Sequence, residues 1–171
     1  GGVRFYGTGM RIINNYFEGL TGKKWDATFA ITSGNAEYGD GKPLTKHFRI
    51  RDAVIASNTL VNNASNFEIG YDGGGFQGNW WHLPPVGMRI ENNVIAGNQD
   101  TLIKIFAQPT SSAWKDNIAW PTAGAVVSRS VVDGVRVMDP KLVKEGEIWR
   151  APRQPLRSRP LTRKDVGPDA K

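Results

Sequence analysis

The sequence lacks several features that would point to common protein classes. It contains no cysteine, which excludes disulfide bonds and thiol chemistry. No apolar run reaches the roughly 18 residues that a transmembrane helix needs. Amphipathic helical patterns of about ten residues are missing too, and 20 glycines and 10 prolines would interrupt any helix. A chain of 171 residues can bury a core. These absences favour one domain built almost entirely from strands.

Motifs of several enzyme classes are missing as well. The sequence has no Gly-x-x-x-x-Gly-Lys-Ser/Thr phosphate loop, no Gly-x-Ser-x-Gly nucleophile elbow and no His-Glu-x-x-His zinc motif. Two histidines without cysteine do not favour a zinc site. The expected outward strand positions offer one carboxylate, Glu68, whereas glycoside hydrolysis requires two that converge. Nucleotide, serine-hydrolase, zinc and glycosidase chemistry are therefore poorly supported.

The net charge of +6 is concentrated near the C-terminus. Residues 141–171 hold nine Lys and Arg against four Asp and Glu, whereas residues 1–140 hold thirteen against twelve. Nothing pairs the basic tail with an aromatic platform, so we do not expect a nucleic acid as partner. Since no apolar run is long enough to span a bilayer, we do not expect a membrane partner either. We divide the chain into coils over residues 1–140 and a basic, Pro-rich capping tail over residues 141–171.

One pattern, apolar-x-x-Asn-x-apolar, recurs four times, around Asn15, Asn58, Asn93 and Asn117. The Asn residues are 43, 35 and 24 positions apart. Helical repeats keep a fixed period, whereas a β-solenoid tolerates loops of different length at one corner of each coil. The variable spacing therefore predicts a β-solenoid.

A second set of segments alternates apolar and polar residues with the period of a strand. Its members are Val3-Arg4-Phe5-Tyr6, Phe29-Ala30-Ile31-Thr32, Phe67-Glu68-Ile69-Gly70 and Ile103-Lys104-Ile105-Phe106. The first and third residues of each segment are expected to point inward, and the second and fourth outward. With the Asn repeats, this alternation predicts an all-β, right-handed parallel β-helix with an irregular C-terminal tail.

The repeated Asn has a structural explanation. Asn tolerates left-handed backbone angles at tight corners and bonds neighbouring backbone groups. Coils stacked about 4.8 Å apart would bring Asn15, Asn58 and Asn93 into a ladder that satisfies inward polar groups. We interpret these residues as architecture, not as ligands of a substrate.

The stretch from Gly1 to Gly22, GGVRFYGTGMRIINNYFEGLTG, resembles a signature of polysaccharide lyase family 6, which includes alginate lyases and chondroitinase-B-type enzymes. Later strings also resemble this family: Asn93-Val94-Ile95, Val137-Met138-Asp139-Pro140, Pro160-Leu161-Thr162 and Asp165-Val166-Gly167-Pro168. The resemblance covers most of the chain, although the first stretch is the distinctive one. Met10 stands where the family usually carries a His at the corner beside the substrate cleft. The polar contact that the resemblance implies for that His is therefore not available here.

The resemblance implies β-elimination on uronic-acid polysaccharides such as alginate, or chondroitin and dermatan sulfate. It implies a Lys base, an Arg in an Arg-His-Gly motif, and Ca²⁺ that neutralises the substrate carboxylate. These groups are expected upstream of Gly1, because no Arg-His-Gly occurs here. We therefore expect a fragment of a secreted or periplasmic bacterial lyase that itself holds no catalytic residue and no metal. The alternative is a non-catalytic β-helix that binds glycan or acts as a structural module.

Seven residues are candidates for binding an acidic polysaccharide. Arg4 is expected to face outward, and the resemblance implies that it holds a substrate carboxylate; a solvated strand residue is the alternative. Tyr6 shares that face and could stack on a sugar. Lys23 and Lys24 follow the signature on a loop, where the family often carries a cation.

The remaining three candidates belong to a Gly-rich loop over residues 71–82. Trp80 and Trp81 need either a surface to pack against or a sugar to stack on, and His82 follows them. Two alternatives are left open for these rings: packing against the side of the β-helix, and stacking on a sugar. Outward Glu68 and Lys104 are expected to pair across adjacent coils as a surface contact of little energetic value.

Overall fold

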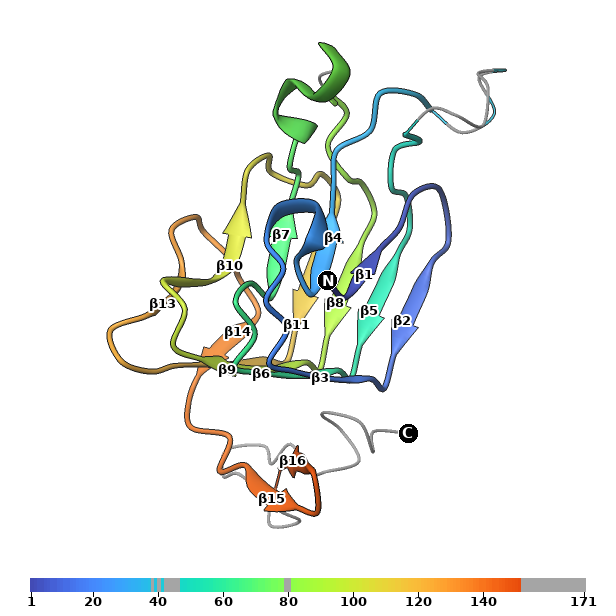
Figure 1. Ribbon diagram of the computed structural model, residues 1–171. Helices are drawn as coiled ribbons and strands as arrows, with labels where there is room; N and C mark the ends of the chain where they lie inside the picture. The colour runs from blue at the N-terminus through green and yellow to red at the C-terminus, as the bar shows by residue number, and fades with distance from the viewer. Residues whose placement is uncertain (38, 40, 42–46, 79–80, 152–171) are drawn as a thin grey trace.

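The computed structural model describes residues 1–37, 39, 41, 47–78 and 81–151. The chain winds into a stack of coils that contribute strands to three parallel sheets (Figure 1). The first sheet has the order β1 (Val3–Arg4), β4 (Phe29–Ile31), β7 (Phe67–Ile69), β10 (Thr101–Ile105) and β13 (Val126–Ser128). The second has the order β2 (Arg11–Ile13), β5 (Val54–Ala56), β8 (Arg89–Glu91) and β11 (Ala113–Lys115). The third has the order β3 (Tyr16–Glu18), β6 (Thr59–Val61), β9 (Val94–Gly97), β12 (Asn117–Pro121) and β14 (Val135–Val137).

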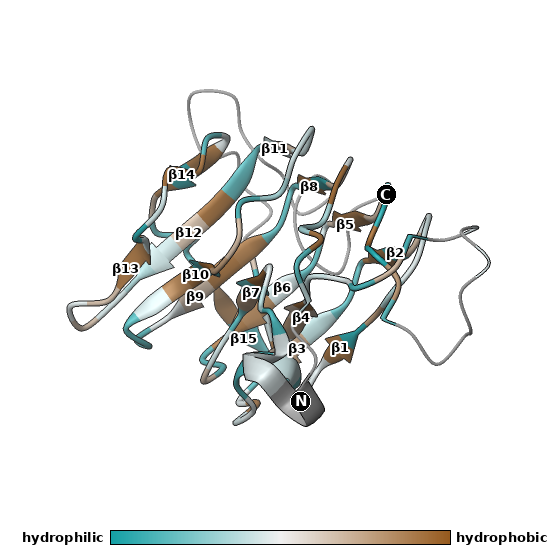
Figure 2. Ribbon diagram, turned by 90° about the horizontal axis from the view of Figure 1, so that it is seen from above, coloured by the Kyte–Doolittle hydropathy of each residue, from teal (hydrophilic) through white to brown (hydrophobic). Residues whose placement is uncertain are grey.

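The predicted parallel β-helix is confirmed, with one difference in the composition of a coil. Each repeated Asn segment contains two strands instead of one, because the Asn lies at a corner between the second and third sheets. In the first coil, for example, Asn15 separates β2, which contains Ile12, from β3, which contains Phe17. A coil therefore has three sides (Figure 2).

Apolar residues of successive coils are aligned in rows inside the stack. The first sheet aligns Val3, Phe29, Phe67 and Ile103, and the last three of these side chains are completely buried. The second and third sheets add the rows Ile12–Ile55–Ile90–Trp114 and Phe17–Leu60–Ile95–Ala119. Burying each large side chain contributes about 1.5–3 kcal/mol. The prediction that the first residue of each alternating segment points into the stack is thus confirmed.

The Asn side chains form the predicted ladder. Asn15 donates from Nδ2 to Oδ1 of Asn58 at 3.0 Å, and Asn58 donates to Asn93 at 2.9 Å. Asn93 donates to Asn117 at 2.9 Å, and the Nδ2 of Asn58 also reaches the carbonyl of Ile12 at 2.9 Å.

The left-handed backbone expected at the repeated Asn belongs to the residue before it. The φ angles there are 61° at Asn14, 57° at Ser57, 56° at Asn92 and 54° at Asp116. This residue makes the turn, and the following Asn is left to bond its neighbours across coils.

The C-terminal region departs from the expected irregular cap. Strands β15 (Val143–Glu145) and β16 (Ile148–Arg150) form an antiparallel hairpin beneath the third sheet (Figure 1). Trp149 of this hairpin donates from its backbone N to Tyr16 Oη at 3.1 Å and from Nε1 to Glu18 at 3.1 Å. The hairpin therefore contacts β3 of the first coil. Residues 152–171 of the predicted tail lie outside the described residues.

None of the helices in the described part is long and apolar enough to cross a membrane.

The ladder predicts a graded loss of stability. Asn58→Ala should lower the free energy of unfolding by about 3 kcal/mol, because it leaves buried backbone groups without partners. Asn15→Ala, at the exposed end of the same ladder, should cost less than about 1 kcal/mol. Urea denaturation of the two variants measures the difference. Equal losses would contradict the ladder as a source of stability.

Candidate functional site

The outer face of the first sheet is accessible at its two ends and covered in the middle. Its outward row is Arg4, Ala30, Glu68 and Lys104, which are aligned from β1 to β10. Arg4 is exposed, as predicted, and Lys104 is 32% exposed. Ala30 is buried, and the 3₁₀ helix η1 (Lys24–Asp26) lies in front of β4 (Figure 1).

Glu68 is buried, contrary to the expectation of a surface position. Its Oε1 accepts from Ser65 Oγ at 2.6 Å and from Lys104 Nζ at 3.4 Å. The predicted pair with Lys104 therefore forms, but only 2% of the carboxylate side chain is exposed. The pair is a partly buried contact and not the weak surface contact that the sequence suggested.

Arg4, Tyr6 and His47 form a cluster at the β1 end of the sheet. The rings of Tyr6 and His47 meet edge to face, with their centroids 4.7 Å apart. Burial raises the pKa of the Tyr6 phenol, and the Arg4 charge offsets part of that effect. Burial also lowers the pKa of His47, and the charge of Arg4 lowers it further. At neutral pH the cluster therefore offers a cation, a protonated phenol and a neutral imidazole.

Two loop segments hold His47 in place. The His47 carbonyl accepts from the Asn35 backbone N at 2.8 Å, and its backbone N donates to Asn35 Oδ1 at 3.1 Å. Next to these bonds, Glu37 accepts from Arg49 and from Arg51, each at 2.9 Å. The hydrogen bond from Arg51 is the main reason why the pKa of Glu37 is lowered. The segments before and after residues 42–46 are thus tied together on both sides of the imidazole.

Trp81 supports this cluster, and its position agrees with the first of the two alternatives left open for its ring, packing against the protein. Its side chain is only 3% exposed and stacks on the His47 ring at 3.9 Å, with 27° between the ring planes. The loop includes the 3₁₀ helix η2 (Gly73–Gly78), and a Cβ on Gly73 would lie 3.2 Å from the Trp81 ring. Glycine there lets the chain pass close over the indole. Trp80 lies outside the described residues, and His82 is exposed.

The structure places Lys23 and Lys24 on the loop that crosses the sheet. Both are exposed, and Lys24 Nζ lies 5.8 Å above the centroid of the Tyr71 ring. Tyr71 belongs to a row of rings in which each contacts the next, with centroids 3.9–6.0 Å apart. We call it the aromatic row; it consists of Tyr6, His47, Trp81, Trp25, Tyr71 and Phe106.

Sequence reasoning did not identify His47 as part of the site. The contact joins residues 41 positions apart in the sequence, and nothing in the local pattern around His47 indicates it. Among the described residues, no group of three or more His, Asp and Glu side chains comes together to hold a metal ion. The described residues therefore do not fit a Ca²⁺ site.

Comparison with known proteins gives one family and one fold. A family model described as Chondroitinase B matches residues 1–160. The chain is similar to the solved structure of the PL6 family alginate lyase AlyGC, with 23% identity and a TM-score of 0.70 over 85% of this chain and 18% of that one. A structure of a point mutant of AlyGC gives 22% identity and a TM-score of 0.74 over 98% of this chain and 22% of that one. The chain thus spans less than a quarter of either lyase. Among curated proteins, none matches.

The lowered pKa of His47 predicts a pH dependence of stability. Below its usual pKa of about 6.5 the unfolded chain takes up a proton that the folded chain resists. The contribution of His47 to the free energy of unfolding is thus complete above about pH 6.5. It is lost as the pH falls through the lower pKa of His47 in the folded protein. His47→Phe keeps a ring on Trp81 but does not titrate. Melting temperatures at pH 7 and pH 5 should therefore differ less in His47→Phe than in the wild type, with His82 present in both; equal differences would contradict the assignment.

Proposed function

Because the chain belongs to the chondroitinase B family, we propose that it supplies part of the substrate cleft of a polysaccharide lyase. The reaction is β-elimination on uronic-acid polysaccharides. Alginate is the first candidate substrate, since the similar solved structures are described as alginate lyases. Chondroitin or dermatan sulfate is the second, in view of the family description.

The observation that carries the proposal is the environment of Arg4. Among the described residues no carboxylate forms an ion pair with this exposed guanidinium, whereas Glu37, ten positions before His47, is already bound by two arginines. Arg4 is thus available for a carboxylate from outside the chain, which a guanidinium can hold with two parallel hydrogen bonds.

Binding a uronate carboxylate has a direct chemical consequence. β-Elimination removes the proton beside that carboxylate, and a second negative charge develops as the proton leaves. A fixed cation on the carboxylate stabilises this charge and makes the proton more acidic. Tyr6 can donate a hydrogen bond to the sugar, and neutral His47 can accept or donate one. In this proposal Arg4 binds and neutralises, and Tyr6 and His47 orient the sugar.

The base that removes the proton is proposed to lie outside this chain, as is any Ca²⁺. The described residues do not fit a metal site, so we derive no step through a metal ion. Secretion or a periplasmic location is proposed for the parent enzyme, because its polymeric substrates would lie outside the cytoplasm.

A non-catalytic glycan-binding module is the second candidate. It would use the same cluster to bind a uronate without cleaving the chain. This alternative is kept because the chain covers only 18–22% of the length of the two similar lyase structures. Activity of the full-length parent on alginate distinguishes the two candidates.

Arg4→Ala should weaken binding of oligouronates to the 171-residue chain by about ten- to a hundredfold, as expected for a lost hydrogen bond to a charged group. Arg4→Lys should recover part of the affinity, because it keeps the charge but not the planar fork. Arg11→Ala removes an exposed arginine from the second sheet and serves as the control. Titration calorimetry gives the affinities. Unchanged binding in Arg4→Ala would contradict the proposed site.

The isolated 171-residue chain should bind oligouronates without cleaving them. The expected result is no increase in the absorbance of the unsaturated uronate product during prolonged incubation with alginate or dermatan sulfate. A steady increase that survives repeated purification would show that a base lies within this chain.

A further inference from the structure

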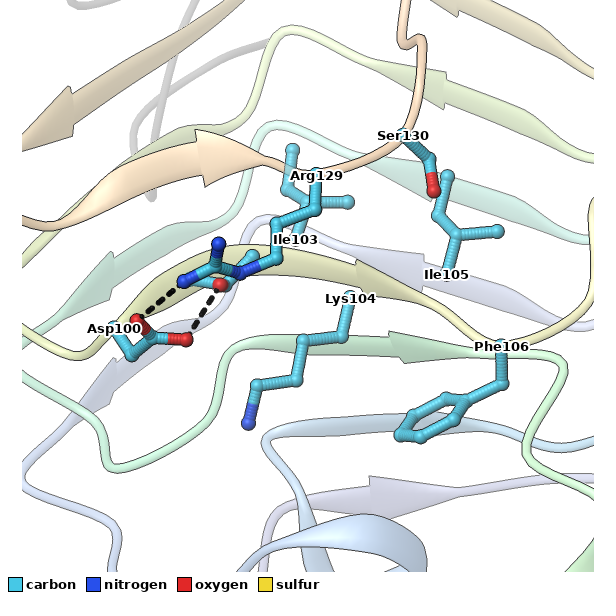
Figure 3. A pocket seen from close by; sticks show the side chains of 8 residues that line it. Asp100, Ile103, Lys104, Ile105, Phe106, Arg129 and Ser130 are labelled. Atoms are coloured by element: carbon cyan, nitrogen blue, oxygen red, sulfur yellow. Dashed lines mark hydrogen bonds and ion pairs between the residues drawn. The ribbon is translucent and has the colours of Figure 1, made fainter.

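An accessible pocket lies on the same sheet face, at the end opposite Arg4. It has a volume of about 200 Å³ and lies over β10 and the end of β13. Asp100 and Phe106 are at its two ends, and Lys104 lies between them (Figure 3). Arg129 and Ser130 border it from the next coil.

Phe106 is the most exposed member of the aromatic row. The Phe106 residue is 52% exposed, whereas Trp81 and Tyr71 in the same row are 3% and 8% exposed. Tyr71 contacts the Phe106 ring with the centroids 5.4 Å apart and 63° between the ring planes, so an exposed residue has its ring supported by a neighbour. An exposed, supported aromatic ring is a suitable platform for the apolar face of a sugar.

Two cations and two carboxylates set the charge of this pocket. Arg129 donates to Asp100 at 2.8 Å, and both side chains are about 70% exposed, so water already screens this pair. Lys104 bonds Glu68 at 3.4 Å, a long contact that leaves the ammonium donors for a second acceptor. Since Glu68 is buried beneath Lys104, the accessible part of the pocket presents Lys104 between Phe106 at one end and the Arg129–Asp100 pair at the other.

We propose that this pocket is a second uronate subsite, in which Lys104 and Arg129 bind the sugar carboxylate and Phe106 stacks on the sugar ring. This inference rests on the proposed function, because it requires the same acidic polysaccharide to bind at Arg4. Arg4 and Lys104 are aligned on strands three steps apart, about 14 Å at 4.8 Å per step. One polysaccharide chain that runs across the stack of coils would contact both ends, passing Lys24 above Tyr71.

The test is titration calorimetry of the 171-residue chain with uronate oligosaccharides of two to six sugars. Phe106→Ala should weaken binding of the hexasaccharide about five- to tenfold, and Phe106→Trp should restore it. Arg129→Gln should weaken it about two- to fivefold, since this cation is exposed. Disaccharide binding, which one subsite can satisfy, should change little in these variants. Lys104 is left intact, because its removal would leave the buried Glu68 carboxylate unpaired.

Lys115→Gln and Val137→Ala are the matched controls, because they change an exposed cation and an exposed apolar residue on the other two sheets. Their affinities should equal that of the wild type. Hexasaccharide binding that depends on Arg4 but not on Phe106 or Arg129 would overturn the second subsite and leave the proposed function intact. Absence of oligouronate binding to the wild-type chain would overturn both. Equal Phe106 dependence for polyphosphate, an anion without sugar rings, would overturn the assignment to sugar.

Discussion

The hydrogen bonds that keep successive coils in register are the interaction on which the rest of this structure depends. Within the stack, each coil pairs its strands only with the coil before it and the coil after it, so the register of a coil is set by its nearest neighbours. A shift of one residue would move every inward side chain to the outside. The buried Asn58 and Asn93 amides resist such a shift, because each bonds its neighbours on both sides and a backbone carbonyl. The row from Arg4 to Lys104 exists because this register is maintained.

The site combines that rigid register with loops that can vary. The strands fix where Arg4 and Lys104 lie, while the loops bring in His47, Trp81 and the lysines of the η1 segment. The loop residues are in turn fastened by specific contacts, such as the bonds between Asn35 and His47 and the arginines on Glu37. A scaffold with fixed strands and well-fastened loops can hold a flexible, charged polymer without first ordering its own residues.

The C-terminal hairpin connects coils that the stack alone would not. Its Trp149 contacts Tyr16 and Glu18, more than 130 positions earlier in the chain. Burial, together with the hydrogen bond to Glu18, raises the pKa of Tyr16 to about 12, so its hydroxyl stays protonated and donates to Glu18 at 2.7 Å. The hairpin therefore adds a long-range contact to an architecture whose stability otherwise comes from nearest neighbours.

The sequence by itself determined the repeating architecture and the direction of many side chains. Both follow from local rules, namely the alternation of residues along a strand and the recurrence of Asn at corners, and so Arg4 faces outward as predicted. The tertiary structure decided which of those outward positions remain accessible. Glu68 is buried and pairs with Lys104 of the next coil, Trp81 is buried against His47, and His47 reaches Tyr6 from a loop. Solvent access depends on what segments distant in the sequence cover, and strand periodicity carries no information about them.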